Sequence, residues 1–128
     1  EKLGWAREDF SIVHAESARG PGNALLLEFE AEHVTEVFSA IGEQRKSAER
    51  VALEAVEEAR EWLAAGVPVG PHLADQLLLP LALAKGGAFR SVRPTGHTRT
   101  QIDVVRTFLG VDTSIEDAGR GDCVYRVG

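Results

Sequence analysis

The stretch of sequence that decides the fold runs from Ala88 to Leu109 and reads AFRSVRPTGHTRTQIDVVRTFL. Its first residues, up to Val92, are typical of a short β-strand, and Pro94 marks the turn that follows. From Thr98 onward, apolar side chains recur at the spacing of an amphipathic helix: Ile102, Val105, Phe108 and Leu109. His97 is therefore expected at the point where a strand gives way to a helix.

This place in the chain suits phosphate chemistry. Backbone N–H groups at a helix start have no intrahelical acceptor, and the helix dipole adds partial positive charge there. A phosphate group is stabilised at such a position, and a histidine beside it can attack phosphorus or transfer a proton near neutral pH. The alternative is that His97 is a polar residue that only caps the helix.

The composition limits the classes of protein that the chain can represent. Its 128 residues suffice for one compact domain or two small lobes, and its 44% content of hydrophobic residues indicates a globular core. The net charge of −6 argues against a broadly basic, nucleic-acid-binding surface. Any contact with RNA must therefore be local or involve residues outside this chain.

The single cysteine indicates a reducing compartment, and the hydropathy pattern bears on whether the chain enters a membrane. Cys123 is the only cysteine, which excludes an internal disulfide and a cysteine-based zinc cluster. No apolar run has the length of a membrane span, because Asp75 and Gln76 interrupt the best candidate, and no signal peptide is visible. We therefore expect a cytoplasmic protein without a membrane contact. Because the chain has no methionine and opens on EKLGW, we also expect a piece of a longer protein.

Turn signals divide the chain into two halves at residues 66–71. In the first half, Ser47 is expected to cap a long helix that Gly66 ends. The expected elements are the strands Asp9–Ala15, Ala24–Glu30 and Val34–Ile41 and the helix Ala48–Ala65. The apolar face of that helix is expected to comprise Ala48, Val51, Ala52, Ala55, Ala59, Trp62 and Leu63.

The sequence pattern of the second half predicts the element order αβαββ. Its first helix is expected from His72 to Lys85, with a kink at Pro80. After the strand and helix described above, a hairpin turns at Gly119-Arg120-Gly121 and joins two strands, Val111–Ile115 and Cys123–Val127. The whole pattern predicts an α+β fold with two layers, in which helices pack on mixed sheets.

Two further motifs could carry chemistry. Asp75 and Gln76 interrupt the otherwise apolar helix, and each costs about 1–3 kcal/mol if its polar groups are buried without partners. Function is one explanation; the other is that Asp75 lies in the exposed first turn, where a carboxylate favours the helix dipole. The loop Gly20-Pro21-Gly22-Asn23 could cradle a phosphate, but a connection between strands is favoured because no helix follows it.

Several blocks together resemble the family of RNA 3'-terminal phosphate cyclases, over essentially the whole chain. In order, they are Gly20-Pro21-Gly22-Asn23, Gly42-Glu43, Val69-Gly70-Pro71-His72-Leu73-Ala74-Asp75-Gln76-Leu77 and His97-Thr98-Arg99-Thr100. The block Leu73-Ala74-Asp75-Gln76 followed by Pro94-Thr95-Gly96-His97 is more specific than any single motif. The family's enzyme is much longer, and this chain resembles its C-terminal portion.

The resemblance implies a domain organisation. Residues 1–66 correspond to the latter part of a small insert domain, and residues 67–128 to the C-terminal part of the main catalytic domain. That main domain consists of repeats that resemble the C-terminal domain of a translation initiation factor. The implied partners are RNA 3'-phosphate ends and the remainder of the full-length cyclase.

The resemblance also implies an ATP-dependent reaction that converts an RNA 3'-phosphate to a 2',3'-cyclic phosphate. His97 corresponds to the histidine that carries AMP covalently, and Asp75 to an active-site aspartate. Our own hypothesis is that Asp75 orients His97 or helps to place a metal-bound phosphate. His72 and Gln76 correspond to the adenosine pocket, although an aromatic ring is usual at the first of these. Gln101 stands where many members have asparagine. A divalent ion, Mg²⁺ or Mn²⁺, is expected, but its ligands are not identified.

The arginine-rich and acidic active-site residues of the family's N-terminal portion are absent from this chain. We therefore expect the isolated chain to bind ATP weakly and not to turn over. Two other interpretations stay open: a non-catalytic, cyclase-like scaffold, which would lack the nucleophilic histidine, and an RNA- or protein-binding module. Catalysis is favoured if Asp75 and His97 converge on one cleft, and a binding module if they lie on opposite faces.

Overall fold

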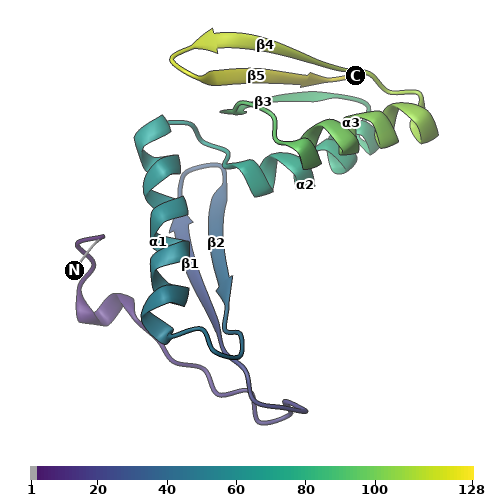
Figure 1. The fold of residues 1–128 in the computed structure, drawn as a ribbon. Helices are drawn as coiled ribbons and strands as arrows, with labels where there is room; N and C mark the ends of the chain where they lie inside the picture. The colour runs from purple at the N-terminus through teal and green to yellow at the C-terminus, as the bar shows by residue number, and fades with distance from the viewer. Residues whose placement is uncertain (1–2) are drawn as a thin grey trace. The chain divides into compact units, whose positions relative to one another are not determined.

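The computed structural model describes residues 3–128 (Figure 1). A short 3-10 turn, η1, covers Arg7–Asp9, and the regular elements follow from residue 24 onward. In chain order they are β1 (Ala24–Glu30), β2 (Thr35–Ile41), α1 (Ala48–Ala65), α2 (Pro71–Leu83), β3 (Gly87–Val92), α3 (Gly96–Leu109), β4 (Thr113–Gly119) and β5 (Asp122–Val127). The α+β class expected from the sequence is confirmed.

The chain forms two compact units that do not follow a single cut in the sequence. The first unit contains residues up to Leu27 together with Phe38–Arg60, and the second contains Glu28–Val37 together with Glu61–Gly128. The tip of the β1–β2 hairpin therefore belongs to the same unit as α2, α3 and the three-stranded sheet. The assignment of residues 1–66 and 67–128 to an insert domain and a catalytic domain stays a prediction.

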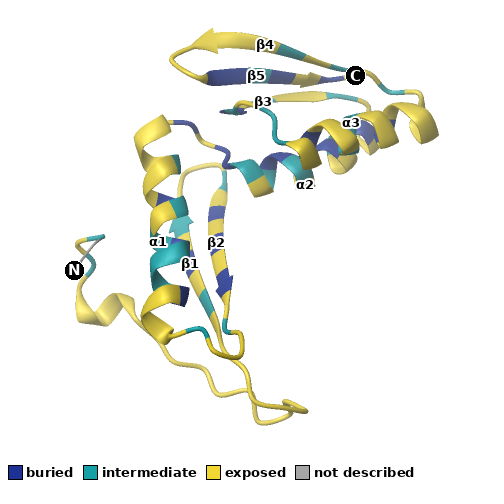
Figure 2. Ribbon diagram, in the orientation of Figure 1, coloured by how far each residue is buried: buried dark blue, intermediate teal, exposed yellow. Residues whose placement is uncertain are grey.

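The second unit is a two-layer structure, with α2 and α3 on one face of a three-stranded sheet (Figure 1). The strand order is β3-β5-β4, and both pairs of neighbours are antiparallel. The predicted order αβαββ is confirmed, whereas the expected mixed sheet is not, because the parallel pairing in the described residues is only an isolated bridge between Val69 and Ser91. The central strand, β5, is largely buried (Figure 2).

The core of the second unit lies between the two helices and β5. Its buried members are Leu78 and Ala82 of α2, Val105 of α3 and Val127 of β5. Four partly buried side chains pack against them: Leu81, Phe89, Ile102 and Val111. These residues recur at helical spacing on α2 and α3, and their burial removes apolar surface from water, which is the main stabilising term for a unit of this size.

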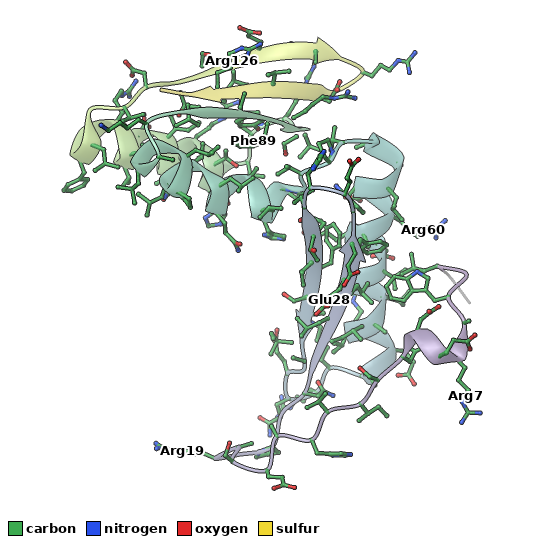
Figure 3. All side chains as sticks on the ribbon, turned by 180° about the vertical axis from the view of Figure 1, so that it is seen from behind. Arg7, Arg19, Glu28, Arg60, Phe89 and Arg126 are labelled. Carbon is green, nitrogen blue, oxygen red and sulfur yellow. The ribbon has the colours of Figure 1, made fainter. Side chains whose placement is uncertain are left out.

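Tyr125 completes the core of this unit on β5. Its ring is fully buried and stacks on Phe89 of the neighbouring strand, with the ring centroids 4.8 Å apart; Phe89 is labelled in Figure 3. The hydroxyl donates a hydrogen bond to the carbonyl of Val92 at 2.8 Å. Burial raises the pKa of Tyr125 to about 12, with smaller contributions from nearby Cys123 and Asp75.

The helix α1 has the bounds that the sequence predicts and belongs to the first unit as far as Arg60. Ser47 caps it by accepting a hydrogen bond from the N–H of Arg50 at 3.2 Å. The buried residues of α1 are Val51, Ala55 and Ala59. Leu63 was expected on the same apolar face but is exposed. Near the base of the hairpin, the N–H of Gly42 donates to the carbonyl of Asn23 at 2.8 Å. The loop Gly20-Pro21-Gly22-Asn23 leads into β1 but does not join two strands, because no strand precedes it in the described residues.

Two sequence-based expectations about elements are wrong. The alternation from Asp9 to Ala15 does not form a strand, and Ile12 and Val13 are 85% and 88% exposed, because no neighbouring strand pairs with this segment. Phe108 and Leu109 were expected in the core but are 81% and 42% exposed, because the buried stripe of α3 ends at Val105. Pro80 lies within α2, which continues to Leu83.

None of the helices formed by residues 3–128 combines the length and apolar character that crossing a bilayer requires.

The raised pKa of Tyr125 predicts a stability change at alkaline pH. An unfolded tyrosine titrates near pH ~10, so the unfolded chain loses the proton before the folded chain does. The contribution of this group to the free energy of unfolding is therefore fully present below about pH 10 and is lost as the pH rises toward the folded pKa of about 12. Because Tyr125 is the only tyrosine, ultraviolet absorbance of tyrosinate reports its titration directly.

The matched variant is Tyr125→Phe, which keeps the ring and removes the titrating hydroxyl. We expect it to lower the free energy of unfolding by about 1 kcal/mol at neutral pH, because the bond to Val92 is lost. It should also remove the part of the alkaline stability loss that belongs to this group, as measured by denaturant unfolding. A wild-type titration at the ordinary tyrosine pKa would contradict this account.

Candidate functional site

The site is built around the start of α3, where the chain leaves β3. Thr95 is the N-cap of this helix and has extended backbone dihedrals. Its hydroxyl oxygen accepts a hydrogen bond from the N–H of Thr98 at 3.1 Å, and the Thr98 hydroxyl oxygen accepts one from the N–H of Thr95 at 3.2 Å. This reciprocal pair is a capping box, a local arrangement that fixes where a helix begins.

A third side chain locks the capping box from α2. The Thr98 hydroxyl donates its hydrogen to Oδ1 of Asp75, with a separation of 2.5 Å. Because that hydroxyl has one hydrogen, the 2.9 Å contact between the two threonine oxygens requires Thr95 to be the donor. Thr98 is fully buried and Asp75 is half-buried, so the carboxylate satisfies a hydroxyl that water does not reach.

His97 lies in the first turn of α3, directly before Thr98, and its side chain is exposed. The predicted place between a strand and a helix is confirmed, but the helix begins at Gly96, two residues earlier than expected. The alternative in which His97 caps the helix is wrong, because Thr95 does so. The N–H groups of Thr98 and Arg99 are bonded to Thr95, which leaves those of Gly96 and His97 as outward donors.

The other predicted site residues lie on α2. His72, Asp75 and Gln76 are spaced by three and four residues, so they share one side of the helix. A shallow depression is lined by Asp75, Gln76, Leu79, Pro80 and Gln101. Because Pro80 has no N–H, the carbonyl of Gln76 lacks its usual intrahelical donor at this depression. His72 is exposed one turn nearer the helix start.

Two charged side chains of the site, the carboxylate of Asp75 and the guanidinium of Arg99, affect the pKa of the buried phenol of Tyr125. The carboxylate of Asp75 raises the pKa of Tyr125, whereas the guanidinium of Arg99 lowers it, and both effects are smaller than that of burial. Asp75 and Arg99 are thus close enough to the phenol to act on its proton equilibrium. Arg99 follows His97 by two residues and is exposed, so it adds positive charge at the start of α3.

Thr95, Thr98 and Tyr125 were not predicted as parts of the site. The spacing of the two threonines, three residues apart directly before an apolar helical pattern, is a signal for a capping box. The contact between Asp75 and Thr98 had no such signal, because it joins residues that are 23 positions apart. No group of three or more His, Cys, Asp or Glu side chains suited to a metal ion occurs within residues 3–128.

Comparisons with known proteins agree with the resemblance noted in the sequence. Residues 3–64 match the insert domain of RNA 3'-terminal phosphate cyclase. Three proteins called RNA 3'-terminal phosphate cyclase are similar to the chain over most of its length. The protein from Ectopseudomonas mendocina (strain ymp) is 46% identical over 88% of this chain and 33% of its own length. The protein from Koribacter versatilis (strain Ellin345) is 47% identical over 90% of this chain and 32% of its own length. The protein from Salmonella enteritidis PT4 (strain P125109) is 50% identical over 87% of this chain and 33% of its own length. The chain thus spans about a third of the length of these relatives.

The capping network predicts the effect of Thr98→Val, which keeps the branched shape and removes the hydroxyl. We expect the free energy of unfolding to fall by about 1–3 kcal/mol, because the cap and the partner of the half-buried Asp75 are lost together. Thr98→Ser should retain most of the stability. The matched control is Thr100→Val, whose exposed hydroxyl bonds only Gly96 within the helix, and whose cost should stay within about 0.5 kcal/mol. Equal losses for both valine variants in denaturant unfolding would contradict the network.

Proposed function

Because this chain belongs to the RNA 3'-terminal phosphate cyclase family, we propose that it carries the residue to which AMP becomes attached during ATP-dependent cyclisation of RNA 3'-phosphate ends. The chain covers only about a third of the relatives' length, so the complete activity belongs to a full-length cyclase that carries this sequence. The observation that supports this role most directly is the position of exposed His97 beside the anchored capping box of α3.

The proposed reaction has three steps: transfer of AMP to the histidine, transfer of AMP to the RNA 3'-phosphate, and ring closure. An unprotonated ring nitrogen of His97 bonds to the α-phosphorus of ATP, and the bond to the β-phosphate breaks with release of pyrophosphate. An oxygen of the RNA 3'-phosphate then displaces the histidine and forms an anhydride with AMP. Finally, the ribose 2'-hydroxyl attacks the RNA phosphorus, loses its proton to solvent and expels AMP, which leaves the 2',3'-cyclic phosphate.

The start of α3 supports the first step electrostatically. The outward N–H groups of Gly96 and His97 and the positive end of the helix dipole are suited to an anionic phosphate. Arg99 adds a full positive charge on the same turn. As negative charge builds on the leaving pyrophosphate, donors that are already oriented stabilise it without reorganisation.

Asp75 acts in this proposal as a positioning residue. The contact in the structure is to Thr98 rather than to His97, so Asp75 holds the turn on which His97 stands. It thereby limits the motion of the attacking nitrogen relative to a bound phosphate, and positioning of this kind contributes to catalysis by making attack geometries more frequent. This route differs from both roles that were expected for Asp75, direct orientation of His97 and placement of a metal-bound phosphate.

The adenosine would lie along α2. Gln76 and Gln101 offer amide donors and acceptors at the depression, and the carbonyl of Gln76 is a further acceptor. His72, on the same side of the helix, can stack on a base, although more weakly than a larger aromatic ring. A divalent ion would neutralise phosphate charge in the reaction. Within residues 3–128, no group of three or more His, Cys, Asp or Glu side chains is arranged to hold such an ion.

The isolated chain is proposed to bind ATP weakly and not to turn over. Its net charge is −6, and phosphate and RNA affinity depends mainly on cationic contacts. Several exposed arginines of the second unit are already paired with carboxylates: Arg90 with Asp122, Arg93 with Asp117, Arg126 with Glu116 and Arg106 with Asp103. The compensating charge must therefore come largely from elsewhere in a full-length cyclase.

The test of this function uses a full-length cyclase with this sequence, incubated with α-labelled ATP and magnesium. We expect acid-labile, base-stable label on the wild-type protein, which is the signature of a phosphorus–nitrogen bond. His97→Asn should remove the label, because the nucleophile is lost. The control is His33→Asn, a substitution of an exposed histidine in the hairpin turn, which should label like the wild type.

Three results would contradict the proposal. Equal label on wild type and His97→Asn would remove His97 from the chemistry, and absence of label on both would favour a scaffold or a binding module. Label on the isolated chain comparable to that of the full-length protein would contradict the proposed need for the remaining residues.

A further inference from the structure

A buried side chain near the tip of the β1–β2 hairpin, Glu36, contacts the start of α2. The burial of β2 alternates, and Glu36 occupies an inward position where an apolar residue is usual. It is only 1% exposed. Because burying a charged side chain costs free energy unless hydrogen bonds compensate for it, Glu36 needs specific partners at this position.

One of these partners is the backbone of Gly70. Its N–H donates a hydrogen bond to Oε2 of Glu36 at 2.7 Å, in a buried environment. Gly70 is the N-cap of α2 and has no side chain that could satisfy the helix start. Glu36 therefore supplies the acceptor that this helix start needs, at the positive end of the α2 dipole, where a carboxyl oxygen is favoured.

The fit around Gly70 is tight. Its φ of −79° is open to any residue, so the requirement for glycine comes from space. A Cβ at this position would lie 2.7 Å from Oε1 and 2.9 Å from Cδ of Glu36. The carbonyl of Gly70 accepts hydrogen bonds from the N–H of Ala74 at 3.0 Å and from the hydroxyl of buried Ser91 at 3.4 Å. The N-cap of α2 is thus held both from β2 and from β3.

We propose that Glu36 is a positioning residue for the nucleotide-binding turns of α2, and that it acts through Gly70. His72, Asp75 and Gln76 all lie within the two turns that begin at Gly70. Loss of the carboxylate would remove the hydrogen bond to Gly70, so the start of α2 and the side chains on it would be less well ordered. The role rests on the proposed function, because that function places the adenosine on α2; the hydrogen bond to Gly70 does not depend on it.

The first measurement is hydrogen–deuterium exchange of the segment 67–76 in a full-length cyclase that carries this sequence. Glu36→Ala should accelerate exchange at the start of α2, because the acceptor for the Gly70 N–H is lost. The exchange rate of Glu36→Gln should lie between those of the wild type and Glu36→Ala, since the amide oxygen of glutamine can still accept this hydrogen bond. The matched control is Glu28→Ala, an exposed glutamate on the neighbouring strand β1 (labelled in Figure 3), which should exchange like the wild type.

The second measurement separates binding from chemistry. Glu36→Ala should raise the KM for ATP in self-adenylylation about tenfold, because nucleotide binding must then order a helix start that this hydrogen bond no longer holds. The rate at saturating ATP should change little, because the attacking residue His97 stands on α3 and not on α2, the helix whose start Glu36 holds. A general loss of folded protein would instead lower the amplitude of labelling and leave KM unchanged.

A third measurement tests the packing directly and stays informative if Glu36→Ala folds poorly. Gly70→Ala should destabilise the start of α2, because its Cβ meets the Glu36 carboxylate. If that collision is the cause, the double variant Glu36→Ala with Gly70→Ala should lose less than the sum of the two single variants. Strict additivity of the two losses would overturn the contact.

Further outcomes decide the positioning role. Unchanged exchange at 67–76 in Glu36→Ala, relative to the Glu28→Ala control, would overturn the proposal. Faster exchange with an unchanged KM would show that Glu36 holds α2 without placing the nucleotide, which also overturns it. If the wild-type protein does not label with ATP, the proposed function fails, and the nucleotide part of this role fails with it. The exchange experiment still decides whether Glu36 anchors the helix.

Discussion

The hydrogen bond from Thr98 to Asp75 is the interaction on which the second unit's arrangement most depends. It joins two helices whose apolar stripes alone would let them slide or rotate against each other, and it does so at the residue that also closes the capping box of α3. A directional bond therefore fixes the register that nondirectional packing of Leu78, Ala82 and Val105 leaves open. That register also sets the position of His97, because the next residue in the chain, Thr98, is the one bonded to Asp75.

Most of the fold could be predicted from local patterns. The helix from Ala48 to Ala65 has strong periodicity and a good cap, and the turn at Gly119-Arg120-Gly121 requires left-handed backbone that glycine adopts without strain. The segment Asp9–Ala15 shows the limit of this approach. Its alternation suits a strand, but a strand also needs a neighbour for its N–H and C=O groups, and alternation in one segment carries no information about that neighbour.

The site was predictable as a set of residues but not as a set of contacts. His97, Asp75, Gln76 and His72 could be chosen because they are polar groups in patterns that resemble a known family. Which atom Asp75 would meet was not encoded locally, because the choice between His97 and Thr98 depends on how α2 crosses α3. Glu36 shows the same limit, since a single glutamate in an alternating strand predicts an exposed position rather than a buried bond to Gly70.

The grouping of the hairpin tip with the second unit has a consequence for how such proteins can be recombined. The family match ends at residue 64, and an exchange of insert segments between relatives would naturally be cut near that point. Such a chimera would take Glu36 from one parent and Gly70 from the other, so any parent with a different residue at either position would bring mismatched halves of one contact. Compatible crossovers must therefore inherit the two positions jointly, as a linked pair.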